Sequence, residues 1–247
     1  MNEENEEREK KEEGAVNGFE FDGNEFVIES GVLIKYVGKD TDVVIPSGVQ
    51  AIGSKAFSLC GDVKSIVIPE SVTQIGAYAF ELCRSLTGID IPDSVTKIGD
   101  GAFRWCAKLT EVKLPDKVTQ IGDYTFDNCW RITSVTVPAG VTNIGFMAFN
   151  GCNALADIEI PKGVKSINAC AFMKCKNLTK IVIPDSVIKM GGKVFEDDAH
   201  IAVYCRAKKA PKTWNAFWNI KETVIDKESQ ATVKYKRHRV TWGYKGK

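Results

Sequence analysis

The chain has 247 residues, of which 44% are hydrophobic and 26% charged, and its formal net charge is +1. This composition is typical of a soluble globular protein, and no stretch approaches 18 consecutive apolar residues, so no membrane-spanning helix is expected. The amino terminus also lacks the apolar core of a secretory signal. As written, the sequence predicts a cytoplasmic protein, or a secreted or cell-surface protein if an upstream signal was removed.

The charge is unevenly distributed between the two ends. Residues 1–13 carry seven acidic and three basic residues and have no aromatic residue, which predicts a disordered charged tail. Residues 206–247 carry twelve basic and three acidic residues, a net charge of +9.

Residues 14–45 predict a β-hairpin followed by a strand. Two apolar runs, Glu25–Ile28 and Val32–Ile34, flank the turn sequence Glu29-Ser30-Gly31. A further strand is expected at Val43–Ile45.

Residues 46–205 are organised by a 23-residue repeat. A fixed period of 20–29 residues is typical of a leucine-rich-repeat solenoid, in which stacked units bury one continuous core. The period is marked by Pro46, Pro69, Pro92, Pro115, Pro138, Pro161 and Pro184.

Each unit has the same internal pattern, which the third unit illustrates. Val95 and Ile98 stand three and six residues after the proline, and Gly99 follows, where we expect a sharp corner with positive φ. Ala102-Phe103 and a cysteine come next, and the unit closes on a period-2 triplet that predicts a short strand with one buried face. Stacked at about 4.8 Å, seven units should extend for roughly 30–35 Å.

Six of the eight cysteines lie on one column of this stack, which raises the alternatives of disulfides or a metal site. Parallel stacked side chains are poorly placed for bridging, and a linear column cannot surround one zinc ion. We therefore expect free, buried thiols and no cofactor. The column comprises Cys60, Cys83, Cys106, Cys129, Cys152 and Cys175.

The seventh unit is degenerate, because Asp198 stands where the cysteine should be. Asp197 and Asp198 would be costly inside a stack, so this unit is expected to be terminal or to loop outward. Residues 206–247 are predicted as a basic C-terminal cap. In that cap Trp214, Phe217 and Trp218 have the i, i+3, i+4 spacing of one helical face.

An edge strand is expected at residues 233–244. Its basic residues block unwanted strand pairing, although weak polyanion binding is the alternative. The two histidines, His200 and His238, are interpreted as surface or capping residues. The basic run comprises Lys234, Lys236, Arg237 and Arg239.

The repeated pattern V-x-x-I-G-x-x-A-F-x-x-C-x-x-L-x-x-I-x-I-P over Val43–Cys205 resembles the BspA-like leucine-rich-repeat family. The resemblance implies a right-handed solenoid, and in the family a hairpin often precedes the first repeat. Together with the helix and strand expected in residues 206–247, the predicted fold is α/β but mostly β, with an N-terminal hairpin cap and a C-terminal helix and strand cap. Members are often bacterial or protist surface proteins thought to bind host or neighbouring-cell proteins. No nucleophile elbow, phosphate loop or metal-binding histidine pair is present, so a non-enzymatic, monomeric protein binder is expected.

The alternation within each closing triplet predicts which residues face outward. These positions are variable and partly acidic, so a basic protein segment is the expected ligand, with an ordinary solvated sheet as the alternative. The candidate binding residues are Asp90, Glu111, Lys113, Asp157, Glu159 and Lys180.

A second candidate surface is an aromatic flank around the Ala-Phe segment. Exposed aromatic residues favour interfaces, although these side chains could equally pack against neighbouring units. A structural spacer in a larger protein and an intracellular scaffold remain alternatives to a binder. The flank comprises Tyr78, Trp105, Tyr124 and Trp130.

Overall fold

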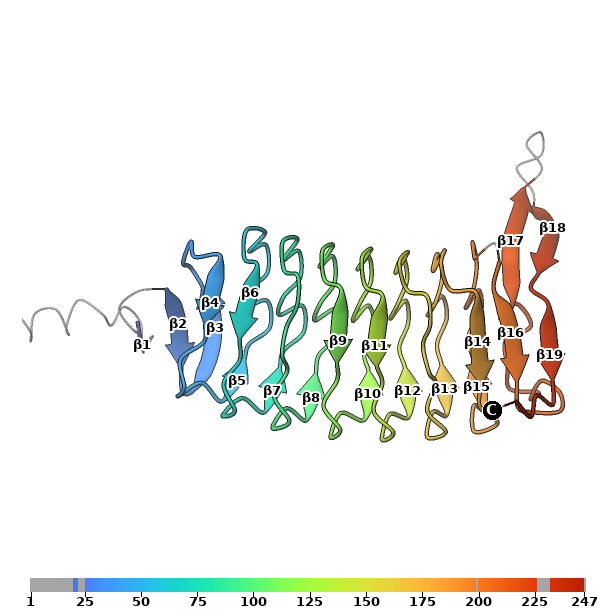
Figure 1. The fold of residues 1–247 in the computed structure, drawn as a ribbon, viewed down its shortest axis with the longest axis horizontal. Helices are drawn as coiled ribbons and strands as arrows, with labels where there is room; N and C mark the ends of the chain where they lie inside the picture. Colours follow the sequence, from blue (N-terminus) through green and yellow to red (C-terminus); the bar gives the residue numbers. More distant parts are fainter. Residues whose placement is uncertain (1–19, 22–24, 199, 226–231, 247) are drawn as a thin grey trace, which may run out of the picture.

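Equivalent residues of successive units lie one above another in the computed structural model of the chain, which describes residues 20–21, 25–198, 200–225 and 232–246. The chain winds into an elongated solenoid whose N-terminal and C-terminal elements lie at opposite ends (Figure 1). All of the elements in these residues are strands. Among them, no helix could span a membrane.

Most of the closing triplets form strands, as their alternation predicted, but those at residues 89–91 and 158–160 do not. These closing strands pair in parallel, β4 with β6, β9 with β11 and β14 with β16, and their middle residues are buried. They are β4 (Asp42–Val44), β6 (Ser65–Val67), β9 (Glu111–Lys113), β11 (Ser134–Thr136), β14 (Lys180–Ile183) and β16 (Ala202–Cys205).

A second ladder of two-residue strands, which the sequence analysis did not predict, ends on the isoleucine column. Its members pair in parallel in two runs, β5 to β8 and β10 to β15, with no pairing between β8 and β10, and β3 (Val32–Tyr36) of the N-terminal hairpin joins the first run at β5. They are β5 (Ala51–Ile52), β7 (Gln74–Ile75), β8 (Lys97–Ile98), β10 (Gln120–Ile121), β12 (Asn143–Ile144), β13 (Ser166–Ile167) and β15 (Lys189–Met190).

The prediction of a positive-φ corner at the repeated glycines is wrong, because none of these glycines has a positive φ. The glycine is needed for a different reason, the close approach of the neighbouring unit's backbone. A Cβ on Gly76 would lie 2.5 Å from the amide nitrogen of Ser54, and one on Gly99 would lie 2.5 Å from that of Ala77. Positive φ occurs instead nine and thirteen residues after each proline.

The core is built around a column of stacked phenylalanine rings. Phe57, Phe80 and Phe103 are fully buried, and consecutive rings lie 5.4 Å apart. Tyr36 of the hairpin stacks on the first ring at 5.2 Å, and Trp218 meets the last one edge-on at 6.3 Å. Aromatic side chains therefore cover both ends of the column.

All eight cysteines are free thiols, and the ladder cysteines have a specific hydrogen-bonding role. In five units the thiol donates to the phenylalanine carbonyl of the preceding unit, as Cys129 does to Phe103 at 3.0 Å. Burial raises the pKa of these thiols well above its ordinary value. The column thus consists of protonated donors, not thiolate ligands.

Thiol titration of the protein, denatured without reductant, is expected to find all eight cysteines free. The reason is that the ladder sulfurs are directed at carbonyl oxygens, not at one another. In the native state Cys60, which is only half-buried, should be alkylated first. Three or more disulfides in the denatured protein would contradict this assignment.

The N-terminal hairpin forms as the turn sequence predicted. Strand β2 (Phe26–Glu29) pairs antiparallel with β3 (Val32–Tyr36), and Ser30 and Gly31 make the turn with φ values of 48° and 76°. The short strand β1 (Glu20–Phe21) pairs with β2 on its outer side. Antiparallel strands therefore begin the stack.

The predicted C-terminal helix is not formed. Trp214 and Trp218 are buried but Phe217 is 43% exposed, so the three aromatics do not share a face. The segment is a shortened eighth turn: the amide of Trp214 donates to the Pro211 carbonyl, as Val187 does to Pro184. The i, i+3, i+4 spacing reflected this turn.

The predicted edge strand is divided into two strands. Strand β17 (Ile220–Ile225) pairs antiparallel with β18 (Thr232–Arg237), and β19 (Val240–Trp242) pairs in parallel with the last closing strand, β16. The β17–β18 hairpin projects from the end of the solenoid (Figure 1).

Of the two alternatives expected for the degenerate unit, outward looping is wrong: Asp198 lies inside the stack, in the last full unit. It occupies the cysteine position of the seventh unit, is 1% exposed, and neither carboxyl oxygen has a hydrogen-bond partner. Burial raises the pKa of Asp198 to about 9. One turn later, buried His238 takes the place of a ladder thiol, with Nε2 2.7 Å from the carbonyl of Phe195.

Candidate functional site

The six predicted residues of the outward face are all exposed, and they line hollows along the closing strands. Asp90, Glu111 and Lys113 line one hollow, which extends from Ser65 to Thr136. A second, toward the C-terminal end, is lined by the other three predicted residues together with Arg206. These three are Asp157, Glu159 and Lys180.

The four carboxylates of this face have no ion-pair partner among the described residues. The ion pairs among the described residues lie elsewhere and join Arg104 to Glu81 and Asp127, and Lys193 to Glu196. Lys113, Lys180 and Arg206 line the same hollows, but none forms an ion pair with these carboxylates. We call the unpaired set the acidic face: Asp90, Glu111, Asp157 and Glu159.

The first hollow is widened at Gly88. A Cβ at this position would meet nothing within 4 Å, so the space beside it is open. Strands β6 and β9 belong to separate sheets, and the segment between them is held to β6 by a single bridge, Val67 to Asp90. The open space at Gly88 and the break in strand pairing between β6 and β9 therefore both lie next to Asp90 and Glu111.

The two ends of this face have different chemistry. At the N-terminal end Val44 and Val67 are 67% and 56% exposed on paired strands. At the C-terminal end the ammonium of Lys180 lies 5.5 Å and 5.6 Å from the ring centres of Tyr204 and Tyr244. Sequence analysis did not find this cation–π cluster, because Tyr244 comes from beyond the repeats.

The predicted aromatic flank separates into two parts, of which the first is formed by the tyrosines. Tyr78 packs over Gly101 of the next unit, where a Cβ would lie 2.3 Å from its ring. Tyr124 meets Phe146 edge-on at 5.2 Å and lies under the guanidinium of Arg104 at 5.4 Å. Both tyrosines are half-buried, so packing against neighbouring units accounts for them.

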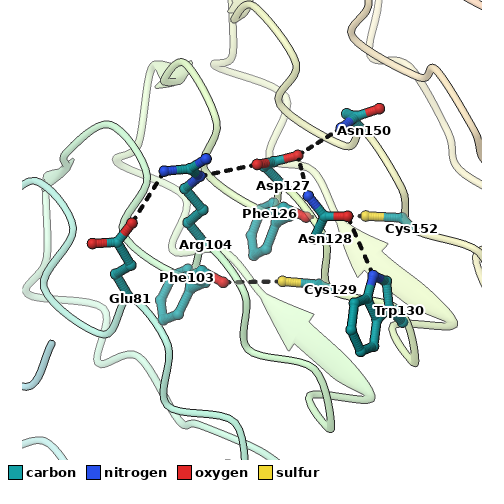
Figure 2. A network of polar contacts seen from close by, with 10 residues as sticks. All are labelled: Glu81, Phe103, Arg104, Phe126, Asp127, Asn128, Cys129, Trp130, Asn150 and Cys152. Carbon is teal, nitrogen blue, oxygen red and sulfur yellow. Dashed lines mark hydrogen bonds and ion pairs between the residues drawn. The ribbon is translucent and has the colours of Figure 1, made fainter. Parts of the chain in front are cut away.

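The second part of the flank is the pair Trp105 and Trp130, whose rings meet edge-on at 5.3 Å. Trp130 is 44% exposed. Its indole nitrogen donates to Asn128 Oδ1 at 3.2 Å (Figure 2). This pair is the part of the flank with exposed aromatic surface.

A chain of polar side chains runs across four units beside this pair (Figure 2). Arg104 contacts Glu81 at 3.2 Å and the buried Asp127 at 3.0 Å, and Asp127 accepts a further bond from Asn150 at 2.7 Å. All four residues stand twelve positions after a repeat proline. This shared position in the repeat is the sequence feature from which the network could have been predicted. Because each charged side chain in this row is paired with a side chain of a neighbouring unit, these contacts join the units to one another.

No cluster of histidine, cysteine and acidic residues that could hold a metal ion occurs in the described part of the chain. Of the basic run, Arg237 donates to the Ala216 carbonyl and to Asn219 Oδ1, and Arg239 is exposed. The side chains of Lys234 and Lys236 lie outside the described residues. The polyanion alternative therefore stays a prediction.

The chain matches the family model of the BspA type leucine rich repeat region, in six copies, over residues 35–156, 73–202 and 144–221. No curated protein matches it significantly.

Solved structures of bacterial leucine-rich-repeat proteins share the fold. A protein from Eubacterium ventriosum is 26% identical with a TM-score of 0.63, over 77% of this chain and 52% of that one. One from Bacteroides ovatus is also 26% identical, with a TM-score of 0.53, over 82% and 67% of the two chains. The T. pallidum leucine-rich-repeat protein is 29% identical with a TM-score of 0.50, over 60% and 82%. On the extent of the family match, the chain belongs to the BspA-type leucine-rich-repeat family.

Proposed function

We propose that the chain is a non-catalytic protein-binding module and that its acidic face binds a basic segment of another protein. The observation that supports this proposal is the acidic face itself, with four exposed carboxylates that have no partner in the described chain and line its hollows. Unpaired carboxylates in a concave surface attract cationic ligands and accelerate their association.

The ladder geometry favours an extended ligand. Stacked closing strands expose their outward side chains as one surface, which solenoid proteins use for extended partners. The two acidic pairs are separated by the neutral strand β11, whose outward residues are Ser134 and Thr136. A partner segment with two basic groups is therefore the best match.

The resemblance to surface proteins extends this proposal to adhesion, with the solenoid at residues 46–205 as the binding part. Residues 1–13, 14–45 and 206–247 would then be a charged tail, an N-terminal cap and a C-terminal cap. An intracellular scaffold or a structural spacer is the competing function. Antibody labelling of intact cells, with and without permeabilisation, distinguishes a surface protein from an intracellular one.

Reversing the charge of the acidic face is expected to weaken partner binding at least tenfold while leaving the melting temperature nearly unchanged. The quadruple variant to lysine replaces favourable charge contacts with repulsive ones at exposed positions. Binding of a partner isolated with the intact chain is measured by calorimetry at low and high salt, since added salt should weaken only the wild-type contact.

A matched control reverses four other exposed carboxylates, each one residue after a repeat proline. They line none of the closing-strand hollows, so the same change in net charge should leave binding intact. Equal losses from both variants would show that net charge, not the acidic face, governs binding. The control positions are Glu70, Asp93, Asp116 and Asp185.

A further inference from the structure

The residue thirteen positions after each repeat proline has a left-handed backbone in every unit. Glycine and asparagine adopt this conformation readily, whereas larger side chains are strained in it. The column has φ values between 59° and 72° and comprises Leu59, Leu82, Trp105, Asn128, Gly151, Lys174 and Asp197.

The repeats provide an internal comparison at this position. The fourth and fifth units have Asn128 and Gly151, the residues that a left-handed backbone favours. The first three units have Leu59, Leu82 and Trp105 in the same conformation. Burial does not explain the choice, because Leu59 is 73% exposed and the other two are only partly buried. Bulky side chains such as Tyr78 and Tyr124 also have a left-handed backbone in this fold, so strain alone does not mark the three residues. What distinguishes them is apolar side chains that stay exposed or half-buried on adjacent units, which favours an interface.

These three residues occupy equivalent positions of adjacent units. The amide of Leu59 donates to the carbonyl of Glu81, and the amide of Leu82 to that of Arg104, both at 2.9 Å, so successive units are held in register. Trp130 extends the row through its contact with Trp105. We call this surface the apolar ridge: Leu59, Leu82, Trp105 and Trp130.

Cations follow the ridge along the chain. Arg84 comes two residues after Leu82, Lys108 three after Trp105, and Arg131 one after Trp130. All three are exposed, and none forms an ion pair with another described residue. In the first unit, the position equivalent to Lys108 and Arg131 is occupied by Asp62. With three basic residues and one acidic residue, the surface beside the ridge is predominantly positive.

We propose that the apolar ridge is a second docking surface, which binds an acidic protein segment that also bears apolar side chains. The apolar groups of the partner would pack on the leucines and tryptophans, and its carboxylates would pair with Arg84, Lys108 and Arg131. The proposal does not rest on the acidic face, whose ligand has the opposite charge.

A random twelve-residue peptide library, displayed on phage and selected on the full chain, tests the partner chemistry. We expect enrichment of peptides that combine apolar and acidic residues. Their affinity should fall at least tenfold for the variant Leu59→Asn, Trp105→Asn, Trp130→Ser, and it should survive charge reversal of the acidic face. Lack of this peptide class, or equal binding to the ridge variant, would overturn the proposal. Ridge-dependent binding to phosphatidylserine vesicles in place of peptides would overturn it in favour of a membrane surface.

The strain argument has its own test in two single substitutions. Leu59→Asn and Lys174→Asn both place asparagine in the left-handed column, at exposed positions with φ of 71° and 60°. Both should raise the melting temperature by about 2–4 °C. Lys174 lies outside the ridge, so its variant should bind the selected peptides normally. A Leu59→Asn variant that melts lower than wild type would show that Leu59 serves folding, and would refute the inference.

Discussion

Replacing Phe103 with alanine is expected to lower the free energy of unfolding by about 3–5 kcal/mol. The ring is 0% exposed and lies between those of Phe80 and Phe126, at centre distances of 5.4 Å and 5.5 Å and nearly parallel to both. Alanine would leave a cavity that neighbouring units cannot fill, because their own ladders fix their spacing. Urea unfolding followed by circular dichroism measures the loss.

The matched control is Leu59→Ala, which removes a large apolar side chain from a position that is 73% exposed. It should change the unfolding free energy by less than about 1 kcal/mol. Because each unit contacts only its neighbours, the Phe103 cavity should also broaden the transition by partly uncoupling the two halves of the stack. A Phe103 variant as stable as the control would contradict the phenylalanine column.

Periodicity and alternation predicted the columns of the solenoid, because both depend on the spacing of residue types along the chain. The second ladder was not predictable in this way, since its two-residue strands are too short to show alternation. The structural reason for the repeated glycine could not be predicted from the sequence either. Gly76 and Gly99 are required by contacts with another unit's backbone, and no local rule reports such a contact.

The candidate sites divide along the same line. The acidic face follows from alternation, so its residues could be named from the sequence. Trp105 and Trp130 of the apolar ridge could also be named from the sequence, as part of the aromatic flank. Its leucines could not, because Leu59 and Leu82 have a backbone conformation that their residue type disfavours. His238 replaces a ladder thiol from 40 residues beyond the last repeat aspartate, Asp198, a relation that only the folded end of the chain reveals.

Asp198 makes the stability of the chain depend on pH in a direction that can be stated in advance. Burial first, and then the neighbouring charge of Asp197, raise its pKa from 3.8 in the unfolded chain to about 9 in the folded protein. Between these values the folded state holds a proton that the unfolded state releases. The contribution of Asp198 to the free energy of unfolding is therefore most favourable at and below about pH 4, and it is progressively lost as the pH rises toward 9.

Asp198→Asn and Asp198→Cys should therefore stabilise the protein by about 2–4 kcal/mol at pH 7, and by almost nothing at pH 4. Both remove the buried acid, and the cysteine also restores the ladder residue found in the six preceding units. Urea midpoints measured from pH 4 to pH 9 should fall more steeply for the wild type than for either variant. Asp197→Asn, at the exposed neighbouring position, is the control: it removes only the weaker of the two causes that raise the pKa of Asp198, so most of the wild-type slope should remain. Parallel pH profiles for wild type and Asp198→Asn would mean that Asp198 is ionised in the folded protein, with its carboxylate reaching solvent.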